Sequence, residues 1–394
     1  MALRFLTSGE SHGKCLNAII EGVPAGIKIE KSFIDNELAR RQVGFGRGGR
    51  MSIEKDAVEI KSGVRHGISM GSPISLEIKN KDWENWIIPM NPEPQDLSDE
   101  VVLEQINAKR ITKLRPGHAD YAGALKYNFE DIRNVLERSS ARETTTRVAV
   151  GAVSKLILKS FGISGFSHVI EVGTVKADCS SLSYAQIAEK AEHSDLRCAD
   201  DEAYEKMKAE IVAAGEQGTT LGGKVQVIFE NLPVGLGSYV HWDKRLDGIL
   251  AQALMSVPAV KAVEIGLGVQ SGEISGLNVH DEIFYSEGKV LRHTNNAGGL
   301  EGGMTNGEPL VITLTMKPIP TMRTPLKSID FLTKEALNAH FERADVCAVP
   351  ACGVVAEAMC AYVLANALLE KFGQDNLSDM LVSFETYKKR VGSF

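Results

Sequence analysis

Hydrophobic positions recur along the chain with two periods, and each period predicts a kind of element. Apolar and polar residues alternate in 222–232, as in a strand with one buried face, and 309–316 is interpreted in the same way. Helical spacing predicts helices over 31–41 and 246–256, and an almost wholly apolar helix over 354–369. A helix that is hydrophobic on most sides belongs in the middle of a core, so we expect 354–369 to lie there.

The rest of the chain mixes short strands with helices and lacks the regular alternation of a βαβ fold. Further strands are predicted at residues 51–60, 64–79, 165–175 and 263–268. Residues 181–214 are predicted to be a helical, charged, solvent-facing insertion, and the proline-rich stretch 81–100 a surface excursion. This mixture is compatible with an α+β fold, without being diagnostic of one.

Composition places the chain among globular proteins with a large core. Of its 394 residues, 43% are apolar and 24% are charged, and no Pro/Ser-rich linker divides them. We therefore expect one catalytic domain over residues 1–373 and a peripheral C-terminal tail over 374–394. A net charge of -7 argues against a general nucleic-acid binder.

The cysteines and apolar runs indicate a cytoplasmic protein. The six cysteines contain no CxxC pair, which favours buried thiols over disulfides or zinc ligands, and we expect no metal site. The first residues carry too short an apolar run for a signal peptide. No uninterrupted apolar run of about twenty residues indicates a membrane span.

The most informative stretch is 115–147, which is rich in arginine. Arginine is selected where phosphate or carboxylate is recognised by two hydrogen bonds at once. Ser140 to Glu143 has the pattern of a capping box, and the free N–H groups of a helix start favour an anion. An ordinary capped helix with surface arginines is the alternative. The arginines in and beside this stretch are Arg110, Arg115, Arg133, Arg138, Arg142 and Arg147.

Two histidines lie in turns that glycine and proline define. His12 stands in SGESHG and His118 in RPGHAD, three residues after Arg115. Such turns leave an imidazole accessible, and an imidazole can deliver a proton to a departing phosphate near neutral pH. A lone turn histidine is more often merely exposed, so these two need an anion nearby to matter.

Glycine-rich segments offer further contacts for an anionic ligand. Residues 42–50 (QVGFGRGGR) match GxGxxG but follow a helix, so we reject a dinucleotide fold and predict a mobile clamp. A disordered loop or an RGG-type RNA contact is the alternative. Residues 295–304 would let a flat ring or phosphate approach the backbone, or they form a hairpin or bulge.

These residues together suit a phosphorylated anionic metabolite and a flat phosphorylated cofactor. A P-loop, a nucleophile elbow and catalytic metal spacing are absent from the sequence. Two other functions are compatible with the same residues. One is a flavin-independent isomerase or lyase acting on a phosphorylated acid, and the other is an RNA-binding protein.

Seven segments, in this order, resemble the chorismate synthase family: SGESHG, RRQVGFGRGGR, RPGHADYAGALKY, RSSARET, NNAGGLEGG, KPIPT and RADVCAVPACGVVAEAM. The resemblance extends from about residue 2 to residue 372. It implies a β-α-β sandwich, with helices layered between antiparallel sheets, assembled as a homotetramer. The implied reaction is the 1,4-anti elimination of phosphate from 5-enolpyruvylshikimate 3-phosphate, which gives chorismate in the shikimate pathway of aromatic amino acid biosynthesis.

The resemblance also implies reduced FMN as cofactor, although the reaction is redox-neutral. His12 would protonate the leaving phosphate, His118 would protonate or orient the reduced flavin, and Asp345 would assist removal of the ring proton. The residues implied to bind the substrate are Arg41, Arg47, Arg50, Arg115 and Arg142. Those implied to hold the flavin are Arg138, Ser139, Ser140, Ala259, Gly302, Lys317, Pro318, Ile319, Pro320, Thr321 and Arg343.

Two departures from the family pattern concern the flavin. Ala344 stands where many members have serine, and Pro258 stands where some have asparagine. NADP also belongs to the family picture, because some members reduce their own flavin. No additional nucleotide-binding domain is evident in the sequence, so we expect an external flavin reductant.

Overall fold

The fold of the computed structural model is built on two antiparallel sheets. The structure describes residues 3–47, 55–341 and 345–394. The first sheet has the strand order β1-β2-β6-β3, with bounds Arg4–Ser8, Cys15–Glu21, Ile74–Lys79 and Val58–Ile60. The second has the order β10-β15-β9-β7-β8, with bounds Val260–Ile265, Leu310–Met316, Gly223–Glu230, Ser164–Val172 and Val175–Lys176.

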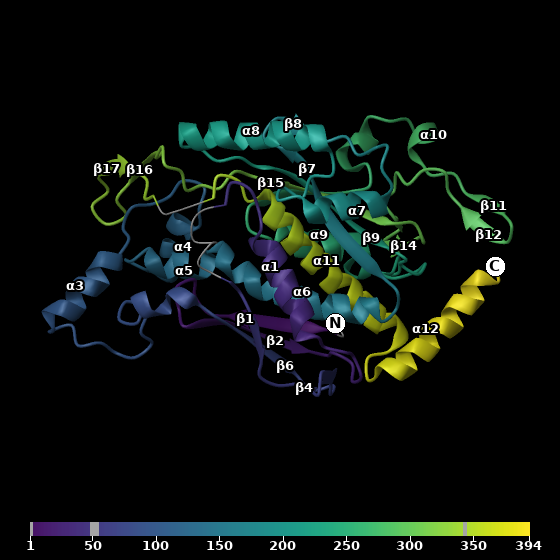
Figure 1. Cartoon of the computed structure of the whole chain (residues 1–394), viewed down its shortest axis with the longest axis horizontal. Coiled ribbons are helices and arrows are strands. Elements are labelled where there is room, and N and C mark those ends of the chain that lie inside the picture. The colour runs from purple at the N-terminus through teal and green to yellow at the C-terminus, as the bar shows by residue number, and fades with distance from the viewer. Residues whose placement is uncertain (1–2, 48–54, 342–344) are drawn as a thin grey trace.

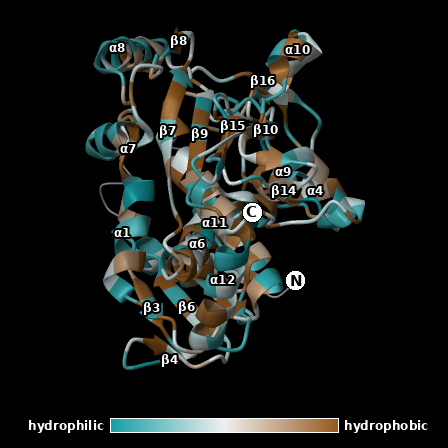
Figure 2. Cartoon of the chain, turned by 90° about the vertical axis from the view of Figure 1, so that its right-hand side faces the viewer, coloured by the Kyte–Doolittle hydropathy of each residue, from teal (hydrophilic) through white to brown (hydrophobic). Residues whose placement is uncertain are grey.

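Helices fill the space between the two sheets (Figure 1). Helix α6 (Thr144–Lys159) contacts the first sheet, and α11 (Val349–Phe372) contacts β7 and β9 of the second. The two helices also pack against each other, with α1 (Lys31–Gln42) and α9 (Leu246–Met255) beside them. Figure 2 shows this layering from the side. The predicted α+β fold, with helices layered between antiparallel sheets, is confirmed.

Buried and partly exposed residues alternate along the strands, so one face of each sheet is turned towards the core. Leu310, Ile312 and Leu314 of β15 are fully buried, while the residues between them are partly exposed. In the first sheet, Ile74 and Leu76 of β6 are fully buried, and the residue between them is partly exposed. Apolar area removed from water is the main favourable contribution to such a core. The strand predictions at 222–232 and 309–316 are therefore confirmed.

Helix α11 is the centre of the core, as its apolar sequence predicts. Nearly all of its residues are buried. Among the described residues it alone has the length and apolarity to cross a membrane, and 89% of its most apolar window is buried inside the protein. Its close approach to α6 depends on Gly151, because a Cβ there would lie 2.3 Å from Cβ of Ala358. The helix is thus a core helix whose neighbour is fitted to it.

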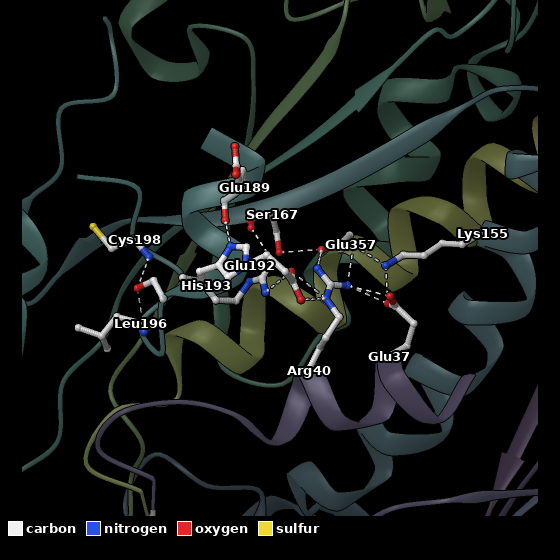
Figure 3. A network of polar contacts seen from close by, with 12 residues as sticks. Glu37, Arg40, Lys155, Ser167, Glu189, Glu192, His193, Leu196, Cys198 and Glu357 are labelled. Atoms are coloured by element: carbon white, nitrogen blue, oxygen red, sulfur yellow. Dashed lines mark hydrogen bonds and ion pairs between the residues drawn. The ribbon is translucent and has the colours of Figure 1, made fainter. Parts of the chain in front are cut away.

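A buried network of charged side chains joins these layers (Figure 3). The carboxylate of Glu357 in α11 accepts hydrogen bonds from Arg40 of α1 at 2.9 and 3.2 Å and from Ser167 of β7 at 2.9 Å. It also pairs with Lys155 of α6, which in turn contacts Glu37. Four elements are therefore held by one buried carboxylate with several partners.

The remaining helices lie around these layers. Their bounds are Glu100–Lys109 (α3), Asp120–Tyr127 (α4), Arg133–Ser139 (α5), Tyr184–His193 (α7), Asp201–Gln217 (α8), Gly276–Val279 (α10) and Leu377–Gly392 (α12). Four two-stranded ribbons accompany them, β4–β5 (Val64–Arg65, Ile68–Ser69), β11–β12 (Phe284–Ser286, Lys289–Leu291), β13–β14 (Leu300–Glu301, Met304–Thr305) and β16–β17 (Lys327–Ile329, Ala336–Asn338).

Two peripheral regions have more buried surface than the sequence indicates. Residues 181–214 are helical, as predicted, but Met207 and Ile211 of α8 are buried, so only its outer face meets solvent. Residues 374–394, predicted to be a peripheral tail, contain α12, and its Met380 and Phe384 are buried. The domain boundaries stay a prediction.

Candidate functional site

A cavity of about 420 Å³ opens where loops from both halves of the chain meet. Its walls come from the turn after β1, the end of α1, the α5–α6 junction, the segment after β15 and the start of α11. Its charged and imidazole-bearing lining residues are His12, Arg41, Arg47, Arg115, His118, Arg142, Lys317 and Asp345. A volume of this size is typical of a small-molecule site.

Two of the arginines share one buried carboxylate. Asp56 accepts from Nη1 of Arg142 at 2.7 and 2.8 Å and from Nη2 of Arg41 at 3.0 Å. Burial lowers the pKa of Arg41 to about 10, with Arg142 and Arg47 acting in the same direction and Asp56 opposing them. Arg41 is still charged at neutral pH, and one aspartate faces two guanidinium groups. An anion in the cavity would therefore relieve this excess of positive charge.

A third arginine, Arg47, contacts Asp345, the residue predicted to assist removal of the ring proton. Nη1 of Arg47 lies 3.2 Å from Oδ2 of Asp345, and both side chains are largely buried. Nε of Arg41 and Nε of Arg47 have no hydrogen-bond partner among the described residues. Buried donors of this kind are costly unless a ligand or water satisfies them. Both nitrogens are themselves enclosed by protein atoms, so a ligand in the cavity would reach them only if these side chains moved.

His12 is held on two sides. Its Nδ1 lies 2.8 Å from Oε1 of Glu137, and its backbone N–H donates to Oε2 of the same carboxylate at 2.7 Å. The imidazole also stacks on the Trp86 indole, with ring centroids 4.0 Å apart. Trp86 belongs to the segment 81–100, which was predicted to be a surface excursion, but its side chain is buried beside His12.

His118 belongs to a second group of three residues. Oδ1 of Asp120 lies 2.6 Å from Nδ1 of His118 and accepts from Nη2 of Arg115 at 2.7 Å. Burial opposes ionisation of Asp120, but hydrogen bonds from Arg115 and His118 outweigh it and hold the pKa of this carboxyl well below its usual range. Asp120 therefore stays charged and fixes both neighbours.

The start of α6 forms another wall. Oγ of Ser140 accepts from the N–H of Arg142 at 3.3 Å, so the predicted cap at Ser140 is present, but it caps the short 3-10 helix Ala141–Glu143 that leads into α6. The N-cap residue of α6 itself, Glu143, makes no side-chain cap bond. The Glu143 carboxylate turns instead to Arg147 and Thr7, which replaces the reciprocal bond of a full capping box. A capped helix start with its cationic neighbours remains a suitable place for a phosphate.

Part of the cavity lining is apolar, and one lining residue has a strained backbone. Leu136, Val257, Met316 and Val355 belong to this apolar part, which offers a surface to a flat ring. Ala259 has φ +68, and its carbonyl accepts from the N–H of Lys317 at 2.9 Å. A non-glycine residue in this left-handed region costs energy, and such strain is concentrated at ligand sites.

Comparisons with known proteins identify this arrangement. The chorismate synthase family profile matches residues 3–369. The chain is 52% identical to the chorismate synthase of Gloeobacter violaceus, over 96% of this chain and 98% of that one, and 52% identical to that of Geobacter sulfurreducens, over the full length of both. The chain belongs to the chorismate synthase family. It is therefore an enzyme, and the family places it in the shikimate pathway.

A solved crystal structure of a chorismate synthase supports the same conclusion at the level of the fold. It superposes on this chain with a TM-score of 0.80 at 42% sequence identity, and it covers 100% of this chain and 99% of its own. At this identity the likeness extends beyond shared architecture.

The structure brings most of the residues predicted from the chorismate synthase motifs to one cavity. Those that line it are His12, Arg41, Arg47, Arg115, His118, Ser139, Ser140, Arg142, Ala259, Lys317, Ile319, Pro320, Thr321 and Asp345. Arg50 and Arg343 lie outside the described residues, as does Ala344. The roles of all these residues stay predictions.

Three predicted flavin residues do not line this cavity. Arg138 donates instead to the Thr7 carbonyl at 3.0 Å and the Gly9 carbonyl at 3.2 Å. Gly302 lies in the turn between β13 and β14, with φ +60 and open space where a Cβ would stand. Pro318 lies between two lining residues without lining the cavity itself.

Several residues of the site were not predicted from the sequence. Asp120 stands two residues after His118 in the same motif, so its proximity was available locally. Glu137 is 125 residues from His12, and no local pattern connects them. Asp56 and Trp86 likewise reach the site only through the fold.

Proposed function

We propose that the protein catalyses the 1,4-anti elimination of phosphate from 5-enolpyruvylshikimate 3-phosphate to give chorismate, as a carbon–oxygen lyase with reduced FMN bound. The C–O bond to phosphate and a ring C–H bond break, a new double bond forms, and no net oxidation occurs. One observation carries the proposal: four arginines, two carboxylate-held histidines and Asp345 share one cavity with an apolar wall.

The arginines account for recognition of the substrate. Arg41 and Arg142 are fixed by Asp56, and Arg115 is fixed by Asp120, so these guanidinium groups are held before a ligand arrives. Preorganised cations lose little side-chain entropy on binding phosphate or carboxylate. We assign Arg41, Arg47, Arg50, Arg115 and Arg142 to the substrate.

The histidines and Asp345 account for the protons. His12 gives its proton to the departing phosphate, and Asp345 assists removal of the ring proton. His118, held through Nδ1 by Asp120, protonates or orients the reduced cofactor. The two histidines have separate carboxylate partners, Glu137 for His12 and Asp120 for His118.

The residues present suit FMN. The capped 3-10 turn that leads into α6, Lys317 and the guanidinium groups of Arg41 and Arg47 offer positive charge to an anionic ligand, and the apolar part of the lining offers a surface to a flat ring. We assign the cofactor to Arg138, Ser139, Ser140, Ala259, Gly302, Arg343 and residues 317–321. When bound, reduced FMN supplies the electron density that helps phosphate leave, which is chemistry no side chain in the cavity offers.

The family supports further parts of the proposal. We infer a cytoplasmic homotetramer that depends on an external reductant for its flavin. NADP would then serve that reductant and not this chain.

An anaerobic assay tests the function. With 5-enolpyruvylshikimate 3-phosphate, chorismate and phosphate should form only when reduced FMN is supplied, and one equivalent of reduced FMN should support many turnovers. Oxidised FMN should bind without supporting reaction. Product formed in step with flavin oxidation would make the protein a reductase. Product formed without flavin would favour an ordinary acid–base lyase.

A further inference from the structure

The carboxylate of Glu137 is committed to the turn that carries His12. Oε2 accepts from the backbone N–H of His12 at 2.7 Å, Oε1 lies 2.8 Å from its Nδ1, and the Glu137 carbonyl accepts from the N–H of Ser11 at 2.9 Å. The Glu137 side chain is only 3% exposed. One residue of α5 therefore fixes both the backbone and the ring of His12.

The surroundings of this pair are charged on several sides. Trp86 covers one face of the imidazole, at an interplanar angle of 28°. Arg133 lies 3.4 Å from Oε1 of Glu137, and Arg133 and Lys109 both lie over the Trp86 ring. Asp82 accepts from Nε1 of Trp86 at 3.0 Å. Among the described residues, Glu137 places a carboxylate in direct contact with the imidazole.

We propose that Glu137 is a positioning residue of the reaction, which holds His12 through Nδ1 so that Nε2 exchanges the proton with a ligand in the cavity. A carboxylate partner at one ring nitrogen fixes the tautomer and orientation of a histidine, and it stabilises the imidazolium form. This inference rests on the role of His12 as the acid in the proposed function.

The proposed role of Glu137 depends on its negative charge as well as on its shape. A neutral side chain of the same shape can still accept one hydrogen bond from His12, but it cannot offset the charge of an imidazolium next to Arg133 and Lys109. Glu137→Gln therefore separates charge from shape. Glu37→Gln is a matched control, because Glu37 is also buried and pairs with an arginine three residues away, Arg40, without lining the cavity.

The test is a double-mutant cycle with His12→Ala in the purified full chain. Glu137→Gln should lower kcat by about 10–100-fold, the range found when a metal-ligating histidine loses its outer hydrogen-bond partner, which we take as a guide. KM and the Kd for FMN should stay within about threefold, and Glu37→Gln should change kcat by less than about threefold. In the His12→Ala background, Glu137→Gln should lower kcat no further, because it acts through His12.

Two results would overturn the inference: an equal loss of kcat with and without His12, or an unchanged kcat in Glu137→Gln. If Glu137→Gln does not fold, Glu137→Asp keeps the charge, shortens the reach and should also lower kcat only when His12 is present. If His12→Ala alone keeps full turnover, the acid role of His12 in the proposed function fails. A crystal structure of Glu137→Gln would then test positioning separately, since an unmoved imidazole would contradict it.

Discussion

Arg47 and Asp345 form an ion pair across the cavity, with Nη1 of the arginine 3.2 Å from Oδ2 of the aspartate. This pair joins a residue assigned to substrate binding to the one assigned to proton removal. In the proposed function, a phosphate or carboxylate of the substrate would compete with Asp345 for the same guanidinium. Substrate binding and the freeing of the base would then be coupled through one arginine.

Asp345→Asn should lower kcat by about 10²–10⁴-fold, the usual range for lost acid–base assistance. Asparagine keeps the size of the side chain and an oxygen for Arg47, so substrate and FMN should still bind. Steady-state kinetics with FMN and substrate titrations check this. Near-normal turnover would remove Asp345 from the mechanism, and lost binding with normal kcat would make it an anchor.

Glu357→Gln should destabilise the protein by about 3–5 kcal/mol at neutral pH, because Arg40 and Lys155 lose the buried charge that they share. Glu202→Gln is the control. It breaks an exposed pair with Lys206 and should cost less than about 1 kcal/mol. Urea denaturation of both variants beside wild type measures these costs. An equal, small effect at both positions would show that the buried network contributes little.

The cost of Glu357→Gln should also depend on pH. Burial opposes ionisation of Glu357, but Arg40 and Lys155 outweigh it and hold the pKa of this carboxyl well below the ordinary value of 4.5. A carboxyl with a depressed pKa contributes stability that is fully present above the ordinary value and is lost as the pH falls through the depressed one. The difference between wild type and variant should therefore shrink below about pH 4.5, and a constant difference down to about pH 3 would contradict this.

Gly151→Ala should destabilise the fold by about 1–3 kcal/mol or more, as overpacking does in tight cores. The added methyl would meet Ala358 at 2.3 Å and the α11 backbone at 2.5 Å. Gly248→Ala is the matched control, since Gly248 is an exposed helical glycine with open space around a Cβ. That substitution should be neutral or stabilise by up to about 1 kcal/mol. Thermal unfolding of the two variants decides whether the helix crossing is as close as described.

The six cysteines should differ strongly in reactivity. All are free thiols; Cys15 and Cys179 are half-buried and the other four are buried. Burial raises the pKa of Cys352, which lines the cavity, to about 12, and that of Cys347 to about 11. Because the thiolate is the reactive form, brief alkylation near pH 8 should modify Cys15 and Cys179 first. Peptide mapping checks this, and early labelling of Cys352 would contradict it.

The sequence predicts local structure better than it predicts which distant parts of the chain contact each other. The periodicity of 31–41, the apolar run inside α11 and the cap at Ser140 follow from residues close together in the chain, and all are present. The division into two sheets does not follow, because strand pairing such as that of β9 with β15 joins residues about eighty to ninety positions apart. The capping box failed in part for the same reason, since Thr7 competes for Glu143.

The site shows the same division. Arginines and turn histidines were identifiable because their local motifs are unusual, and the family resemblance assigned their roles. Their carboxylate partners are ordinary aspartates and glutamates in sequence, and only the fold makes Glu137 and Asp56 special. Asp120 is the exception, because its motif also contains His118.

The central position of α11 has a consequence for how the chain is made. A ribosome that has synthesised residues 1–348 has released the strands of both sheets, but not the helix that covers β7 and β9. Until residues 349–372 emerge, apolar strand faces have no permanent cover, and such surfaces are prone to aggregate. Contacts between the ends of a long chain also form slowly. The helix that completes the core thus leaves the nascent chain in need of protection for most of its synthesis.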